Sequence, residues 1–314
     1  MPRAYMPLKA VANPPLPPLL TFANGVRLVS RDELRPSKLE GWEQVFSLEE
    51  LRDIREWYLA LACDWAGPDA DMPTGTSPET RLANAHLGLQ VAAPIGTFLS
   101  VCIREQDAGQ HPCLMMTRFE RFHGTVWSRM RSFNGMTSRE VESIVNGVID
   151  ILEKGDARAV NPIRLFEHGL ISTDRYIRIL LWVTAMDGIL MAVKEETFVS
   201  RLCFLLGADS QVFPKEDDVY IRRPTVVRDV AKDLFKLRSE LAHGAKIGRR
   251  FWEAREDLRT LFDLQAYGAV PPRYCNLLEE SALSLLTRIL RKIILDNLVD
   301  EFSSVKQWKA RLNS

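Results

Sequence analysis

The sequence predicts an α+β protein, with a smaller mixed α/β domain at residues 1–135 followed by an all-α helical bundle at residues 136–314. Before residue 135, short β-branched or aromatic runs alternate with turn-forming residues, which is typical of strands and hairpins. After Gly135, apolar residues recur at steps of three and four, which is typical of amphipathic helices that pack into a bundle. The division therefore follows a change in the period of the apolar residues.

Two hairpins are expected in the N-terminal domain. The pair Asn24-Gly25 separates apolar runs at 19–22 and 26–30, and this residue pair is a signal for a hairpin. A turn-rich segment separates a second pair of runs, at 95–104 and 113–122. These runs therefore predict a second hairpin.

One helix is expected in the same domain. Ser47 and Glu50 form a capping box, and apolar residues follow at helical spacing, so we predict a helix over 47–63. Residues 1–18 contain several prolines and are expected to form an extended, proline-rich arm. Residues 67–78 are rich in Pro, Gly, Asp and Thr and are expected to form a loop.

Caps and glycines divide the C-terminal domain into helices. Thr137 and Glu140 form a capping box at the first helix, which stops near Gly155. Pro224 suits the first turn of a later helix, and Gly244 suits its end. No strand is expected beyond Gly135. The predicted helices are 137–155, 162–169, 172–191, 195–206, 224–243, 251–264 and 276–298, with a polar loop at 208–221.

The composition excludes several classes of protein. Lys+Arg 41 against Asp+Glu 41 gives no net charge, which excludes a uniformly basic protein that coats nucleic acid but allows a local basic patch. The 5 cysteines include no C-x-x-C pair and predict free thiols in a reducing compartment. Asp187 interrupts the best apolar run, 179–193, so no membrane span is predicted. We therefore expect a soluble, cytoplasmic protein. No metal-ligand cluster or cofactor motif is found, so neither a metal nor a cofactor is expected.

An arginine followed five positions later by a histidine is the candidate for chemistry. This spacing occurs three times, so spacing alone decides nothing. In the last pair, Arg238 and His243, a small polar residue, Ser239, follows the arginine. That pair also lies on a predicted helix and directly before a glycine. The other two pairs are Arg81 with His86 and Arg118 with His123.

The surroundings of this last pair are basic. Residues 219–250 hold nine bases against three acids, a local charge of +6. Such a charge run is commonly only a solvated helix face, but it would also suit the phosphates of RNA. The candidate RNA-binding residues are Arg222, Arg223, Arg228, Lys232, Lys246, Arg249 and Arg250.

At these residues the sequence resembles the HEPN superfamily, and within it the Apea-like HEPN domains. The resemblance is to the motif Arg238-Ser239-Glu240-Leu241-Ala242-His243 with its trailing glycine, and to the order of the preceding helices. It covers about residues 137–300 and leaves the N-terminal part unassigned. Asp187 stands where such domains often have Glu, and Phe235 stands where they often have Tyr.

The resemblance implies a metal-independent endoribonuclease that forms a homodimer, with two motifs facing each other across a two-fold axis. Arg238 would hold the phosphate, and His243 would transfer protons during attack by the 2′-OH, giving a 2′,3′-cyclic phosphate. Ser239 is a candidate for orienting this pair, and Glu240 for tuning the protonation of His243. A role as a toxin or as an antiviral or stress effector, with a regulatory protein partner, is the biological expectation.

Other interpretations stay open. Positions five apart in a straight helix lie about 140° apart around its axis, so one chain aims both groups at one point only if the helix ends near His243. Arg238 could be a surface residue whose stem packs along the bundle, and His243 could simply favour the negative end of the helix dipole. The domain could then be a non-catalytic HEPN module that binds RNA, a nucleotide or a protein partner and mediates dimerisation. Alternatively, the N-terminal part could be the functional domain, with the bundle only oligomerising it.

Overall fold

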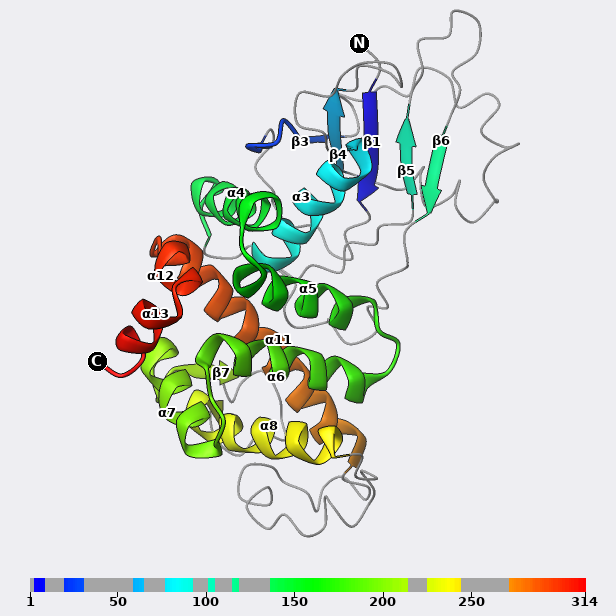
Figure 1. Cartoon of the computed structure of the whole chain (residues 1–314). Helices are drawn as coiled ribbons and strands as arrows, with labels where there is room; N and C mark the ends of the chain where they lie inside the picture. The colour runs from blue at the N-terminus through cyan, green and yellow to red at the C-terminus, as the bar shows by residue number, and fades with distance from the viewer. Residues whose placement is uncertain are drawn as a thin grey trace, which may run out of the picture. The chain divides into compact units, whose positions relative to one another are not determined.

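The computed structural model describes residues 3–8, 20–30, 59–64, 77–92, 101–104, 115–118, 136–213, 225–243 and 271–314. The chain divides into two compact units, Met1–Lys154 and Gly155–Ser314. Helices and an antiparallel sheet are both present, which confirms the α+β class (Figure 1). Helix α4 (Ser138–Lys154) belongs to the N-terminal unit, whereas the boundary expected at residue 135 precedes it.

A six-stranded antiparallel sheet forms the N-terminal unit, in the order β2-β3-β4-β1-β5-β6. Both predicted hairpins are confirmed, since β2 pairs with β3 and β5 pairs with β6. In the first hairpin Gly25 adopts a φ of 74°, a left-handed conformation that glycine reaches without strain. The strands are β1 (Arg3–Leu8), β2 (Leu20–Thr21), β3 (Arg27–Ser30), β4 (Leu59–Asp64), β5 (Val101–Arg104) and β6 (Met115–Arg118).

Two predictions for this unit are wrong where the structure describes them. The helix expected over 47–63 ends in strand β4, and residues 47–58 of that prediction lie outside the described residues. β4 lies between β1 and β3 and is buried from Ala60 to Cys63, so it lacks the polar alternation of a half-exposed strand. The arm expected over 1–18 contains β1, which is an internal strand rather than a free segment.

Pro7 is tolerated in β1 because the pairing of β1 with β5 does not extend to its position. β1 pairs with β4 along its whole length, from Arg3 to Leu8. Among the described residues, its pairing with β5 is limited to Ala4 and Tyr5. A proline has no N–H to give to a sheet, so it fits a strand where one neighbour is missing.

Helix α3 (Pro78–Ala92) contacts β1 and β4 and was not predicted. Its residues are buried on nearly all sides, so no polar face marks the helical period. α4 packs on α3, and a Cβ at Gly88 would lie 2.9 Å from Cα of Val145. The capping box predicted for α4 is present, since the Glu140 carboxylate accepts a hydrogen bond of 2.7 Å from the backbone N–H of Thr137.

The C-terminal unit is a bundle around α6, which contacts α5, α8 and α11 (Figure 1). α7 ends at the predicted Gly207, and α5 begins earlier than predicted, with Pro162 inside it. Two short strands, β7 and β8, pair where only helices and a polar loop were expected. Pro224 and the helix expected over 251–264 lie outside the described residues. The elements are α5 (Ala157–Ile171), α6 (Arg175–Leu190), α7 (Glu195–Leu206), β7 (Gln211–Phe213), β8 (Thr225–Val226), α8 (Val227–Ala242), α11 (Pro271–Leu295), α12 (Val299–Ser303) and α13 (Val305–Arg311).

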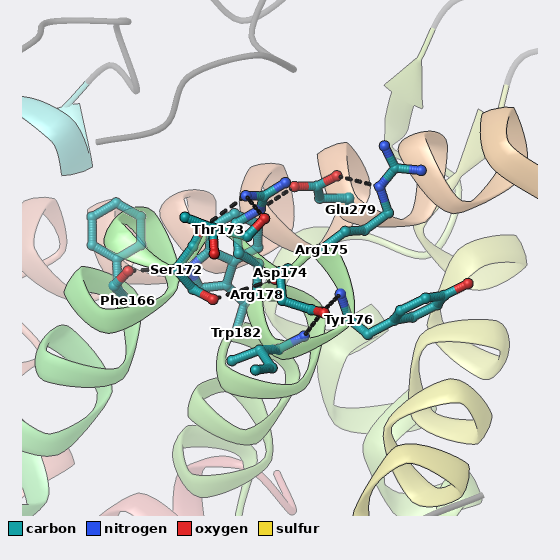
Figure 2. A network of polar contacts seen from close by, with 10 residues as sticks. Phe166, Ser172, Thr173, Asp174, Arg175, Tyr176, Arg178, Trp182 and Glu279 are labelled. Carbon is teal, nitrogen blue, oxygen red and sulfur yellow. Dashed lines mark hydrogen bonds and ion pairs between the residues drawn. The ribbon is translucent and has the colours of Figure 1, made fainter. Parts of the chain in front are cut away.

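The first half of α6 is fixed by a buried polar network (Figure 2). The Arg178 guanidinium donates to the carboxylate of Glu279 on α11 and to the carbonyl oxygen of Ser172, the latter at 2.8 Å. Arg175 lies 3.5 Å from the same carboxylate. Burial raises the pKa of Glu279, and the two arginines oppose that rise. The network therefore docks the start of α6 onto α11.

The end of α6 is held by side chains from later helices. Met191 ends the helix in a left-handed conformation, with a φ of 50°. Arg201 on α7 donates to the carbonyl oxygens of Leu190 and Met191, both at 2.8 Å. The buried indole of Trp308 on α13 donates to the carbonyl oxygen of Ile189 at 2.6 Å. These donors satisfy carbonyl groups that the helix itself leaves free.

Candidate functional site

Helix α8 carries the predicted motif. Its apolar residues, among them Val230, Leu234 and Leu237, are buried, and the helix packs against α6, α7 and α11. The helix ends at Ala242, and His243 is its C-cap, with an N–H that donates to the carbonyl oxygen of Ser239 at 3.1 Å. The helix thus ends at the predicted place.

The exposed side of α8 carries three bases at steps of four residues: Arg228, Lys232 and Lys236. We call these three residues the basic stripe. At 100° per residue, Ser239 and the exposed His243 lie on the same side of the helix as this stripe. Arg228 is 61% exposed, and its guanidinium lies 4.0 Å from Asp209, a distance at which screening by solvent is strong. The other predicted RNA-binding residues, Arg222, Arg223, Lys246, Arg249 and Arg250, lie outside the described residues.

Arg238 lies on a different flank of α8, toward α6. Its Nη2 donates to Oδ2 of Asp187 at 2.6 Å, and the side chain keeps an exposure of 26%. The guanidinium carbon lies 5.7 Å from the centre of the Phe235 ring. That ring in turn packs 5.4 Å from the ring of Phe198 on α7. An ion pair and an aromatic face therefore fix the position of the guanidinium.

Asp187 is the group that the sequence did not identify as part of the site. Its side chain is 14% exposed, and its Oδ1 is buried without a hydrogen-bond partner among the described residues. Burial raises the pKa of Asp187, and the charge and hydrogen bond of Arg238 oppose that rise. The one signal in the sequence was an acidic residue at a position where HEPN domains often have Glu.

The predicted catalytic residues do not converge within one chain. Helical geometry separates Arg238 from His243 by about 140° around the α8 axis. Arg238 pairs with α6, while His243 is exposed at the helix end. Ser239 is half-buried, and Glu240 is exposed. Among the described residues, no hydrogen bond or ion pair joins the side chains of Arg238, Ser239, Glu240 and His243 to one another.

The first of the other two Arg…His pairs has a structural role. Arg81 donates through Nε to the carbonyl oxygen of Asn24 at 2.8 Å and so supports the β2–β3 turn. His86 is buried on α3, with its Nε2 3.2 Å from Nε2 of Gln90. In the remaining pair, Arg118 ends β6, and His123 lies outside the described residues.

Within the described ranges, no group of three or more His, Cys, Asp or Glu side chains could hold a metal ion. Over the same ranges no single helix is long and apolar enough to cross a membrane. α6 and α7 have the required length and hydropathy only when they are taken together, and the chain bends by 78° between them. Of the cysteines in the described ranges, Cys63, Cys102 and Cys203 form no disulfide bond.

The chain matches no family model, no curated protein and no solved structure. The resemblance to HEPN proteins therefore rests on the motif and helix order given above. The function has to be inferred from α8 and the side chains that contact it.

Proposed function

We propose that this protein is a metal-independent endoribonuclease of the HEPN type that acts as a homodimer in the cytoplasm. One observation carries the proposal: His243 stands exposed at the end of α8, on the side along which the basic stripe runs. Lysine and arginine side chains spaced along a helix can follow an RNA backbone through its phosphates. A strand lying along the stripe would then bring a phosphate to the histidine.

The reaction needs a base, an acid and a cation. The base takes the proton of the ribose 2′-OH while the 2′-oxygen bonds to the adjacent phosphorus. The bond from phosphorus to the 5′-oxygen breaks, and the acid protonates that oxygen, which leaves a 2′,3′-cyclic phosphate and a 5′-OH. Imidazole can serve as base or as acid, so the His243 side chains of two copies supply the two roles.

Arg238 supplies the cation. A guanidinium binds phosphate oxygens through planar, charge-assisted hydrogen bonds and offsets the negative charge that develops as the 2′-oxygen attacks. Ser239 and Glu240 remain candidates for supporting roles beside Arg238 and His243.

The test is cleavage of single-stranded RNA in excess chelator by the wild type, His243→Ala, Arg238→Ala and His168→Ala. His168 is a matched control because it is also exposed in the last turn of a helix, α5, away from α8. We expect the wild type and His168→Ala to produce cyclic-phosphate ends, and the other two variants to lose at least about 100-fold in rate. Equal cleavage by all four proteins, or no cleavage once metal is chelated, would refute the proposal.

A second candidate function is a non-catalytic HEPN module that binds RNA, a nucleotide or a protein partner. The Arg238–Asp187 pair favours it, because the charge of the guanidinium is already balanced within the chain. This candidate predicts that the wild type and His243→Ala bind RNA equally and that neither cleaves it. Cleavage that depends on His243 would exclude it.

A further inference from the structure

We propose that Asp187 is a positioning residue of the phosphate site, which holds the Arg238 guanidinium in place and competes with an RNA phosphate for it. The inference rests on the proposed function, because it takes Arg238 as a phosphate ligand. It goes further by naming the carboxylate that sets how tightly this phosphate is bound.

The first step is that Arg238 is held but still accessible. A guanidinium presents five N–H groups in a planar fork, and the bond to Asp187 involves only Nη2. The Phe235 ring lies beside its carbon at 5.7 Å. About a quarter of the side chain is exposed, at 26%. An oxyanion arriving from solvent can therefore reach a guanidinium whose orientation is already fixed.

The second step is that Asp187 depends on Arg238 for its charge. Its Oδ1 is buried and accepts no hydrogen bond from the described residues. Arg238 is the one described cation that forms an ion pair with it. A carboxylate in such surroundings is poorly solvated, and breaking its ion pair costs more than at a free surface.

The third step is competition between two anions. When a phosphate binds Arg238, a carboxylate and a phosphate share one cation at a partly buried position. Their repulsion is weakly screened there, so the carboxylate lowers the affinity of Arg238 for phosphate. Replacing Asp187 with a neutral residue of the same shape should therefore strengthen the binding of phosphate by Arg238.

The test measures binding of a short 2′-O-methyl RNA oligonucleotide. Its 2′-oxygens are methylated, so no 2′-hydroxyl can attack the adjacent phosphorus and the backbone stays intact. The proteins are the wild type, Asp187→Asn, Arg238→Gln and the double variant Asp187→Asn/Arg238→Gln. Asn keeps an oxygen acceptor for Arg238 and removes the charge. We expect Asp187→Asn to bind about tenfold more tightly and Arg238→Gln to bind more weakly. Asp187→Asn should have no effect once Arg238 is absent.

Glu167→Gln is the matched control, because Glu167 forms a 2.7 Å ion pair with Arg164 on α5. It changes the net charge by the same amount, and we expect it to bind RNA as the wild type does. Circular dichroism verifies that each variant is folded. If Asp187→Asn does not fold, Asp187→Ser serves as a second neutral variant.

The outcomes separate this inference from the proposed function. Weaker binding by Arg238→Gln together with unchanged or weaker binding by the neutral Asp187 variant overturns the role of Asp187 and leaves the phosphate site in place. Equal binding by Arg238→Gln and the wild type overturns both, since Arg238 is then no phosphate ligand. Tighter binding by Glu167→Gln as well would show that net charge, rather than Asp187, sets the affinity.

Discussion

The two ends of α6 carry the same chemical pair in different surroundings. At the start, the Arg178 and Glu279 side chains are 4% and 0% exposed. At the end, the Arg238 and Asp187 side chains are 26% and 14% exposed. Arg178 also donates to two backbone carbonyl oxygens, whereas Arg238 has no further hydrogen bond among the described residues.

The difference teaches how burial assigns a role to an ion pair. Arg178 is surrounded by acceptors and closed to solvent, so its guanidinium has no means of meeting a ligand. It serves to fix how α6 packs on α11. Arg238 keeps donors that face solvent and can exchange or share its partner. An arginine–carboxylate pair therefore gives a structural contact in one place and a candidate binding group in the other.

The largest expected effect concerns the buried Arg178–Glu279 pair at the start of α6. Arg178→Ala leaves the Glu279 carboxylate buried beside only the more distant Arg175, and it removes the donor for the Ser172 carbonyl. We expect the free energy of unfolding to fall by about 3–5 kcal/mol, measured by denaturant titration. Arg238→Ala is the matched change at the end of α6, where the pair is partly exposed, and it should cost about 1–2 kcal/mol, between the values for a surface pair and a buried one. Equal losses would abolish the distinction between the two ends.

A smaller effect concerns the packing of α5 against α6. A Cβ at Gly169 would overlap the Trp182 indole, whose N–H donates to the carbonyl oxygen of Phe166 at 3.1 Å. We expect Gly169→Ala to lower the free energy of unfolding by about 1–3 kcal/mol, because the indole or α5 must move. Tryptophan fluorescence during unfolding should report the change. Unaltered stability would mean that α5 and α6 can separate without cost.

The smallest effect has the opposite sign and concerns the end of α6, beside Asp187. A Cβ at Gly188, the residue after Asp187, would meet no atom of the described residues within 4 Å apart from its chain neighbours and the backbone of its own helix. Alanine favours the helix over glycine, so Gly188→Ala should raise the free energy of unfolding by about 0.5–1 kcal/mol, which a thermal melt can detect. Destabilisation would indicate that this surface is covered, for example by a second copy of the chain.

The sequence predicted those parts of the fold that local chemistry decides. Asn24-Gly25 identified the first hairpin, and Thr137 with Glu140 identified the start of α4, because a turn or cap depends on residues a few positions apart. Gly207 likewise marked the end of α7. The steps of three and four in α8 located its buried face and its end at His243.

The parts that were missed depend on distant residues. α3 and β4 are buried on most sides, so neither shows the polar face that distinguishes a helix from a strand. β7 and β8 become strands only by pairing with each other across the segment between them. At the candidate site, Arg238 and His243 were selected by their spacing together with Ser239, the predicted helix and the glycine that follows. Asp187 was not, since it reaches Arg238 across 51 positions of sequence through the packing of α6 on α8.

The bond from Trp308 to the carbonyl oxygen of Ile189 has a consequence for how the protein is made. It spans 119 residues, so the last turn of α6 is synthesised long before its donor has been translated. At about 5–20 residues per second, that interval lasts roughly 6–24 s. During this time the nascent C-terminal unit lacks the residue that closes it. Its final packing therefore awaits the synthesis of α13, and until then chaperones can still bind its incompletely packed core.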